Sequence, residues 1–372
     1  MAQRDLYIDR LRSVMTALVI LHHTAITYGA PGGWFWTELK PSRTPTGILL
    51  TLFVSTNQAY FMGFFFLLAG YFTPASLEKK GYWHFICDRF LRLRLPLLAF
   101  GLVLGPLTAA IVDAFAGNGF WPTWVWLWQH HRFINGPLWF AQALLIFSLG
   151  YCAWRALLGA PLAASERAPK PIPGARWWLL SAVGVAAGAL ALRQFFPVGV
   201  NVFGLQLAYF SSYVFLFAMG IAAWRHDWLR QLSWPQARVW IWGLVLTWPA
   251  LPVGMLLIRW QGWNTNTSTG ISGASILYAL WEPLVAWGLI AGWLLWFRPR
   301  MNQPSALWNW LNRRAYAVYI LHPPVLVTIA LLLHGWAAPA LVKLGVVGTL
   351  VCIATWLVSD PFVRMPGLRR VV

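Results

Sequence analysis

Charged side chains are scarce in this sequence. Asp, Glu, Lys and Arg together make up only 10% of the 372 residues, whereas a soluble globular chain carries about a quarter. This shortage excludes a protein whose mass lies in a water-soluble domain. Hydrophobic residues make up 59% of the chain and its mean hydropathy is +0.59. The composition therefore predicts a polytopic membrane protein, embedded in the lipid bilayer.

Cysteine is also rare. The three cysteines, Cys87, Cys152 and Cys352, lie far apart in or beside apolar segments and form no C-x-x-C pair. A disulfide framework and a zinc site both need closer, regular spacing of such residues. We therefore expect neither structural disulfides nor a metal site.

Acidic residues are much fewer than basic ones. The chain has 10 Asp and Glu against 28 Lys and Arg, which gives a net charge of +18. The basic residues fall in short clusters between apolar runs, and no basic tract with interleaved polar surface is present. This pattern argues against a nucleic-acid partner, because it is the distribution that membrane topology requires.

The apolar runs predict an all-α protein with about ten transmembrane helices in one domain, residues 1–372. Most runs hold about 20 apolar residues, enough to cross ~30 Å of hydrocarbon. The longest polar connection, residues 160–176, is rich in Pro and Ala and is interpreted as a cytoplasmic linker. The expected spans are residues 12–30, 46–75, 95–116, 136–158, 177–195, 202–224, 237–259, 272–297, 313–334 and 339–358.

The distribution of basic residues predicts the orientation of these spans. With ten spans and a cytoplasmic N-terminus, 22 of the 28 Lys and Arg fall on the cytoplasmic side and 6 on the outer side. Cytoplasmic loops carry the excess of positive charge in membrane proteins. We therefore expect both termini in the cytoplasm.

The first apolar segment contains Arg12 and His23, with ten residues between them. Eleven helical steps of ~1.5 Å place His23 roughly 16 Å further along the helix. If Arg12 lies at the membrane surface, His23 lies near the midplane, where an ionisable side chain is expensive and indicates a functional site. The alternatives are a snorkelling Arg12 and a His23 bonded inside the helix bundle.

A second cluster, Arg89, Arg92 and Arg94, marks the cytoplasmic edge of the third span. Arg89 and Arg92 are three residues apart and share a helix face. Arginine binds phosphate through two parallel hydrogen bonds, so this cluster suits a phosphate-bearing donor such as an acyl-CoA. Anchoring to anionic lipid is the alternative interpretation.

Five further polar or aromatic residues are candidates for the substrate side. Glu282 and His322 stand at membrane depth and are each followed by proline. They could face a water-filled cavity, orient His23 or exchange protons with it, or they could stabilise the bundle. Asn57 and Gln58 share a long apolar segment, and Trp139 ends an outer stretch rich in tryptophan, at 121–140. Tryptophan suits sugar rings, but it also forms the interfacial belt of membrane proteins.

Six segments occur together in an order that resembles the acyltransferase-3 family of integral-membrane acyltransferases. The first, YIDRLRSVMTALVILHH, is similar to the family's opening helix with its Arg-x10-His signature, met here by Arg12 and His23. Ala69 stands where the family usually has Ser. The other five segments are FFFLLAGYF, RFLRLRLP, GPLWFAQALL, YAVYILHPPVL and DPFVRMPGLRRVV. The six are spread along the sequence, so that the resemblance extends over nearly the whole chain.

The resemblance implies a multi-pass O-acyltransferase of the inner (plasma) membrane. An acyl-CoA such as acetyl-CoA would be the donor substrate, with no permanently bound cofactor, and a hydroxyl of a cell-surface or periplasmic glycan would accept the acyl group. His23 would serve as base or as acyl carrier, and Arg12 would orient the site or bind donor phosphate. The alternatives are acyl transfer to a lipid or small metabolite, and a transporter or flippase of lipid-linked glycan with Glu282 on its path.

Overall fold

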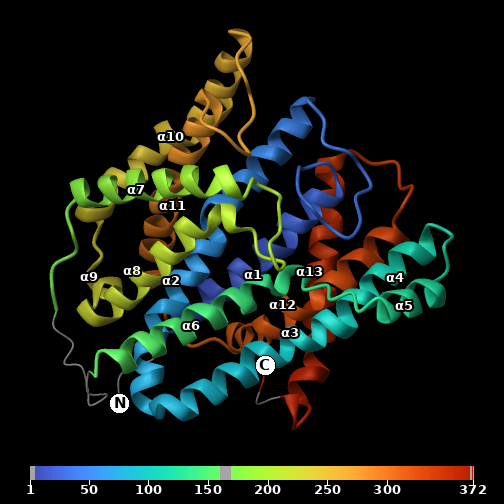
Figure 1. Ribbon diagram of the computed structural model, residues 1–372, viewed down its shortest axis with the longest axis horizontal. Helices are drawn as coiled ribbons and strands as arrows, with labels where there is room; N and C mark the ends of the chain where they lie inside the picture. Colours follow the sequence, from blue (N-terminus) through green and yellow to red (C-terminus); the bar gives the residue numbers. More distant parts are fainter. Residues whose placement is uncertain (1–4, 160–168, 369–370, 372) are drawn as a thin grey trace. The chain divides into compact units, whose positions relative to one another are not determined.

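The computed structural model describes residues 5–159, 169–368 and 371. Across these residues the chain forms helices joined by loops, and it contains no β-strand (Figure 1). The predicted all-α class is therefore confirmed for the described part of the chain. The first nine residues of the expected linker, 160–168, lie outside the described residues, and residues 169–174 are not helical.

The helices follow one another as α1 (Leu6–Thr27), α2 (Pro45–Arg89), α3 (Leu95–Ala99), α4 (Gly105–Phe115), α5 (Phe120–Gln129), α6 (Trp139–Leu157), α7 (Ala175–Phe195), α8 (Phe210–His226), α9 (Trp228–Gln231), α10 (Trp234–Trp260), α11 (Gly273–Arg300), α12 (Ala306–Leu332) and α13 (Ala340–Arg364). Four short helical segments, η1 (Phe90–Arg94), η2 (Phe100–Leu104), η3 (Gly136–Leu138) and η4 (Leu207–Tyr209), continue or precede these helices; η1 and η2 have π-helical geometry.

Eight helical stretches of the described residues are long and apolar enough to cross a membrane, so the chain is a multi-pass membrane protein. The first stretch, Pro45–Phe115, has 71 residues, far more than the ~20 of one crossing, and its backbone leaves helical geometry at Gly81 (φ 70°). The helix α1, which begins with Asp9, Arg10 and Arg12 in its first turns, is not among the eight. The count of ten and the cytoplasmic termini stay predictions.

The helix ends agree with the expected spans to within a few residues at most positions. The span expected at 237–259 is α10, and that at 177–195 is α7. Two expectations were wrong. The helix α2 continues past residue 75 to Arg89, and the expected outer loop 121–140 contains the helix α5. Both differences arise because helical backbone satisfies its own hydrogen bonds, which favours it over open loop beside apolar neighbours.

The described residues separate into two compact units. Unit 1 comprises the described residues of 1–8, 58–86 and 146–302, and unit 2 those of 9–57, 87–145 and 303–372. Helices α7 to α11 therefore belong to unit 1, and α3, α4, α5, α12 and α13 to unit 2. The chain passes from one unit to the other within α1, twice within α2, within α6, and in the connection between α11 and α12.

Unit 2 is built on α1, α12 and α13, with α12 and α13 packed side by side (Figure 1). One core cluster joins Ile20 of α1, Val318 of α12 and Val351 of α13, all fully buried. Gly348 lets α13 approach α1 closely, because a Cβ at this position would lie 2.6 Å from Leu21. Small residues at helix contacts are the usual device for close packing in membranes.

Unit 1 packs α10 against α11, and α11 against α7 (Figure 1). Its closest backbone contact joins α2 and α8. A Cβ on Gly70 would lie 2.1 Å from the Phe217 carbonyl oxygen, and one on Gly220 would lie 2.1 Å from that of Leu67. The segment FFFLLAGYF thus serves as a packing surface, in which Gly70 is indispensable for the approach of the two backbones.

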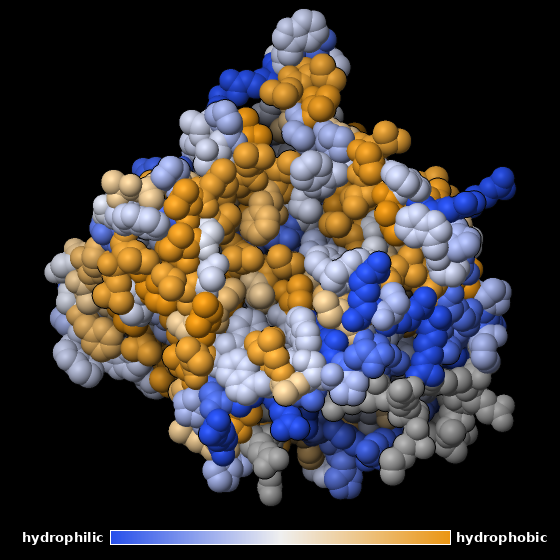
Figure 2. Space-filling view, turned by 180° about the vertical axis from the view of Figure 1, so that it is seen from behind, coloured by the Kyte–Doolittle hydropathy of each residue, from blue (hydrophilic) through white to orange (hydrophobic). Residues whose placement is uncertain are grey.

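Large apolar side chains remain exposed on the outer helices. Leu246 of α10 is 77% exposed and Leu180 of α7 is 70% exposed, and much of the face drawn in Figure 2 is hydrophobic. A water-soluble protein rarely leaves such extended apolar surface uncovered. Lipid tails cover it without cost, in keeping with a membrane protein.

Candidate active site

The structure brings His23 and His322 together in unit 2. His23 lies one turn before the end of α1, and His322 lies in the middle of α12. Their rings are nearly parallel, at an interplanar angle of 10°, and Nδ1 of His23 is 3.1 Å from Nε2 of His322. The neighbouring His22 meets the His23 ring edge-on, with centroids 5.5 Å apart and an interplanar angle of 86°. The nitrogen that meets His322 belongs to His23.

The proline after His322 determines which of its nitrogens carries the proton. Pro323 has no N–H, so the Tyr319 carbonyl four residues earlier lacks its helical partner. His322 replaces that partner, because its Nδ1 lies 2.7 Å from the Tyr319 oxygen. A carbonyl can only accept, so Nδ1 of His322 donates and Nε2 of the neutral ring must accept.

The protonation of His322 determines which nitrogen of His23 carries a proton. With both rings neutral, Nδ1 of His23 donates to Nε2 of His322 across their 3.1 Å contact. The lone pair of His23 is then on Nε2. A histidine whose one nitrogen is held by a hydrogen bond, while the other is an open base, is the arrangement that general-base and nucleophilic catalysis use.

Trp34 covers the histidine pair. It lies in the loop between α1 and α2 and stacks on His23, with ring centroids 3.8 Å apart and an interplanar angle of 11°. It is also nearly parallel to His322, at 5.9 Å. The Trp34 Nε1 atom is buried and has no hydrogen-bond partner among the described residues. A buried donor without a partner is costly, and in a site it is available to a ligand.

A buried ion pair holds the loop that carries Trp34. Glu38 accepts a hydrogen bond from Nζ of Lys343 on α13, and both side chains are more than nine-tenths buried. The other Glu38 oxygen lies 3.6 Å from Nδ1 of His334. The backbone N–H of Glu38 donates to the Thr27 carbonyl at 2.8 Å. These contacts fix both ends of the loop, so that Trp34 keeps its place over His23.

One face of α12 leads from the histidine pair to the arginine cluster. Tyr316, Tyr319 and His322 are three residues apart and lie on the same side of the helix. The Tyr316 and Tyr319 rings stack at 6.4 Å, and the Tyr319 and His322 rings are 6.0 Å apart. The Tyr316 hydroxyl donates to the carbonyl of Arg92 at 2.7 Å. The predicted donor-binding segment is therefore joined to the helix of His322.

The arginines of the predicted cluster lie at the end of α2 and in the short segment η1 that follows it. Arg89 is the last residue of α2, while Arg92 and Arg94 belong to η1. Arg92 pairs with Asp88 at 3.1 Å, and its side chain is 55% exposed. Arg12, 49% exposed, is 3.8 Å from Asp9. Such partly exposed pairs are weak, so these guanidiniums can exchange their partners for an anionic ligand.

Trp139 is the first residue of α6, after the turn η3. Its neighbour Phe140 contacts the Tyr319 ring at 6.3 Å, and the Tyr319 hydroxyl donates to the Pro137 carbonyl. The GPLWF segment is thereby attached to α12 close to the histidine pair.

Two other predicted residues, Gln58 and Glu282, meet in unit 1. They line a cavity of about 10 Å³, near the smallest that holds one water molecule. Glu282 pairs with Arg193 at 2.5 Å, and Gln58 donates to the Tyr213 hydroxyl at 3.0 Å. The Arg193 guanidinium also lies over the Tyr278 ring, at 5.0 Å. Glu282 thus has a buried partner, as the interpretation of bundle stabilisation requires.

Sequence reasoning missed several residues of these clusters. Arg193 is one of the basic residues near the end of an expected span, but it is buried within α7 and only 1% exposed. Trp34 was not considered, since a tryptophan outside a span is typical of the interfacial belt. The remaining predicted residue, Asn57 of α2, is 4% exposed, and its Nδ2 has no partner among the described residues.

The comparisons with known proteins gave one match. A family model described as an acyltransferase domain, Acyl_transf_3, matches residues 5–358, which is nearly the whole chain. The search of curated proteins and the search of solved structures found no significant match.

Proposed function

The chain belongs to the acyltransferase family whose model spans residues 5–358, and from this premise we propose an acyl-CoA-dependent O-acyltransferase of the inner membrane. A short acyl group, acetyl or similar, moves from cytoplasmic acyl-CoA to a hydroxyl of a cell-surface or periplasmic glycan. The observation that carries the proposal is the hydrogen-bond chain from the Tyr319 carbonyl through His322 to His23. This chain leaves Nε2 of His23 as a base.

In the proposed reaction, Nε2 of His23 takes the proton of the acceptor hydroxyl. At the same time, the oxygen of that hydroxyl attacks the thioester carbonyl carbon. The tetrahedral intermediate then expels the CoA thiolate, which takes the proton from His23, so that an ester and CoA thiol are formed. In the alternative route through an acyl-histidine, the same lone pair attacks the carbonyl first and expels the CoA thiolate. The acceptor hydroxyl then attacks the acyl group and gives its proton to the thiolate, and breakage of the C–N bond releases neutral His23. His322 supports both routes, because its Nε2 accepts from the Nδ1–H of His23 and stabilises the cationic ring.

Trp34 is the proposed donor to the negative charge that develops on the carbonyl oxygen. Its Nε1 is buried and has no partner among the described residues, and its ring stacks on that of His23. A preorganised N–H in a dry site stabilises an oxyanion far more than it would in water. This role uses the donor that the fold leaves unsatisfied.

The donor phosphates are assigned to Arg89, Arg92 and Arg94. This assignment is supported by the hydrogen bond from the Tyr316 hydroxyl to the Arg92 carbonyl, which joins the arginine segment to the helix of His322. Arg12 is a further phosphate ligand or orients the site. A cluster of arginines matches the several phosphates of CoA, because each guanidinium can donate two parallel hydrogen bonds.

The acceptor side is assigned to Trp139 and Asn57 of unit 2, while the candidates Gln58 and Glu282 belong to the polar cluster of unit 1. Tryptophan offers an apolar face to a sugar ring, whereas an amide group binds hydroxyls. The strongest support for this assignment is the side-chain amide of Asn57. Its Nδ2 is buried and has no hydrogen-bond partner among the described residues, which favours a polar ligand.

Proteoliposomes test the assignment of the two substrates. Acetyl-CoA labelled in the acetyl group is supplied on the side of the cytoplasmic loops, and a polysaccharide rich in free hydroxyls is enclosed on the other side. We expect label to reach the enclosed polysaccharide in ester linkage, and none when His23 is replaced by Gln. Label found only in lipid, or only in free acetate at the rate of empty liposomes, would contradict the glycan acceptor.

A further inference from the structure

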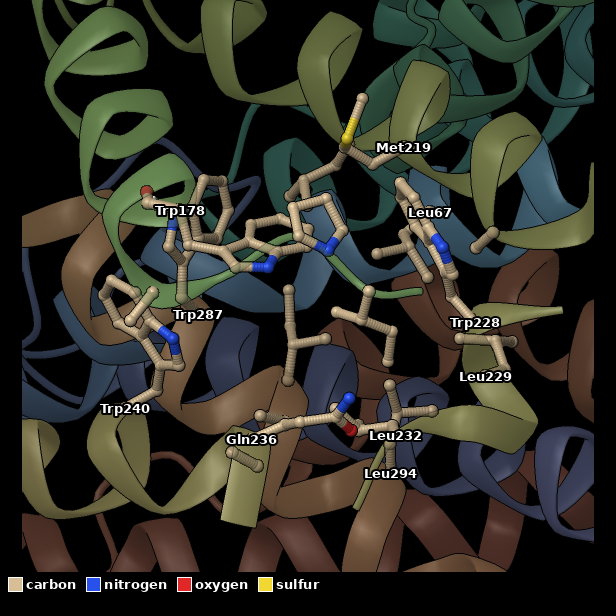
Figure 3. Close-up of a pocket in the computed structure, with 18 of the residues that line it drawn as sticks. Leu67, Trp178, Met219, Trp228, Leu229, Leu232, Gln236, Trp240, Trp287 and Leu294 are labelled. Atoms are coloured by element: carbon tan, nitrogen blue, oxygen red, sulfur yellow. Dashed lines mark hydrogen bonds between the residues drawn. The ribbon is translucent and has the colours of Figure 1, made fainter. Parts of the chain in front are cut away.

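Unit 1 contains a second, larger cavity, far richer in tryptophan than the polar cluster. It has a volume of about 170 Å³ and lies among α2, α7, α8, α9, α10 and α11. Figure 3 shows Trp178, Trp240 and Trp287 on one side of it and Trp228 on the other. The proposed acyl transfer uses none of these residues.

The polar atoms that reach the cavity wall are largely occupied. The Nε1 of Trp228 donates to the Lys170 carbonyl at 3.0 Å, and that of Trp287 donates to the Trp178 carbonyl at 3.2 Å. The Oε1 of Gln236 accepts from the backbone and side chain of Ser233. The wall therefore presents mainly ring faces and aliphatic groups, and an apolar cavity of this kind does not hold water.

The size of the cavity limits its occupant. An apolar cavity of about 150 Å³ takes one benzene-sized molecule, so that 170 Å³ accommodates a segment of a single alkyl chain. Two chains side by side would not fit. In a bilayer, the tails of phospholipids are the alkyl chains present at high concentration around such a cavity.

Basic residues follow the cavity-lining residues at one end. Arg176 comes directly after Ala175, and Arg238 directly after Ala237. Both arginines are exposed, and neither has a partner among the described residues. By contrast, Arg230 is paired with Asp5 at 3.2 Å. Two available cations beside an apolar cavity suit an amphiphile with an anionic head, and anionic lipids are attracted by about 1 kcal/mol per basic residue near the membrane surface.

We propose that this cavity binds one acyl chain of an anionic phospholipid, whose headgroup phosphate is held by Arg176 and Arg238. Both arginines belong to segments expected on the cytoplasmic side, where the leaflet is anionic. The bound lipid would fill the space between α7 and α10 and thereby hold unit 1 together. This site is independent of the proposed acyl transfer.

Electron paramagnetic resonance of spin-labelled lipids tests the proposal. The full-length protein is reconstituted in phosphatidylcholine vesicles that contain either phosphatidylglycerol or phosphatidylcholine with a nitroxide on one chain. We expect a motionally restricted component that favours phosphatidylglycerol. The Ala291→Phe variant, which fills the cavity, should abolish this preference, and the Arg176→Gln/Arg238→Gln variant should reduce it by about fivefold per arginine.

Two matched variants serve as controls. Val253→Phe adds the same ring to an exposed face of α10, and Arg259→Gln removes an exposed charge at the other end of that helix; both should keep the preference. An unchanged preference in the arginine variant overturns the proposal, even if Ala291→Phe fails to fold. The proposal is also overturned if spin-labelled palmitoyl-CoA gives a restricted signal and phosphatidylglycerol gives none. That result would show that the cavity binds the acyl-CoA donor.

Discussion

Nε2 of His322 accepts the Nδ1–H of His23 across 3.1 Å, and the direction of this hydrogen bond follows from a proline. Pro323 leaves the Tyr319 carbonyl without its helical donor, and Nδ1 of His322 takes that place at 2.7 Å. Through these two hydrogen bonds the proline leaves the lone pair of His23 on Nε2. The missing N–H of Pro323 thus selects the tautomers of both histidines.

Replacing His322 by Gln removes the partner that orients His23. We expect kcat to fall by about 10²- to 10⁴-fold, the range seen when a catalytic histidine loses its orienting group, while KM for acyl-CoA stays unchanged. Steady-state kinetics of purified protein measure both values. His84→Gln, which replaces an exposed histidine of α2, is the control. A His322→Gln enzyme with the kcat of the unmodified protein would refute the role of the pair.

Pro323→Ala tests the origin of the tautomer. The new N–H can bond to the Tyr319 carbonyl and compete with Nδ1 of His322, so that we expect kcat to fall by roughly tenfold. Pro324→Ala restores a donor to the carbonyl of Ile320 instead, and it should have a much smaller effect. The ratio of the two kcat values is the measurement, and equal losses would show that only the helix kink matters.

Trp34→Phe keeps an aromatic ring over His23 but removes the N–H. If that N–H stabilises the oxyanion, kcat should fall by about 10²-fold, the lower end for loss of one such donor. Trp36→Phe is the matched control, since its Nε1 is also buried without a partner among the described residues, yet its ring contacts Phe115 and His334. Equal activity of the two variants would remove Trp34 from the mechanism.

Removing one partner of the Glu38–Lys343 pair in unit 2 should be costly, whereas removing both should not. Lys343→Met leaves the Glu38 carboxylate buried, which we expect to lower the free energy of unfolding by about 3–5 kcal/mol, and adding Glu38→Gln should restore most of it. Arg364→Gln removes a 73%-exposed partner of Asp360 and should cost less than about 1 kcal/mol. Thermal unfolding in detergent compares them. Additive losses in the double variant would contradict a paired role.

Donor binding by the arginine cluster predicts a change in KM. Arg89→Gln with Arg92→Gln should raise KM for acyl-CoA by at least about tenfold, because charge-assisted bonds to phosphate are lost, and kcat should change little. Arg43→Gln, an exposed charge in the loop before α2, should leave KM unaltered. An unchanged KM in the double variant would exclude donor binding by these arginines and favour the interpretation that they anchor the protein to anionic lipid.

Much of the fold follows from hydropathy. Spans such as 177–195 and 237–259 coincide with α7 and α10, since lipid requires a helix of about 20 apolar residues. The extension of α2 to Arg89 and the helix α5 could not be predicted, because both lie in segments without a full apolar run. The helix α5 packs against α4, and packing of this kind supplies most of the stability of a short helix.

The candidate site was only partly accessible from the sequence. Spacing identified His23, and the proline-flanked His322 was a candidate partner, but no periodicity relates two residues 299 positions apart. The sequence does not single out Trp34 and Arg193. Tryptophan is common in the interfacial belt, and arginine is common near the ends of membrane spans. Their significance lies in contacts, a stack on His23 and a bond to Glu282, that only the packed helices produce.

The most direct test of His23 as the reactive base is turnover of labelled acetyl-CoA by purified protein in detergent. The unmodified protein should bind acetyl-CoA and hydrolyse its thioester slowly when no acceptor is present. His23→Gln should bind acetyl-CoA with similar affinity and show no hydrolysis above the buffer rate. Hydrolysis by a well-folded His23→Gln protein at the unmodified rate would contradict the account.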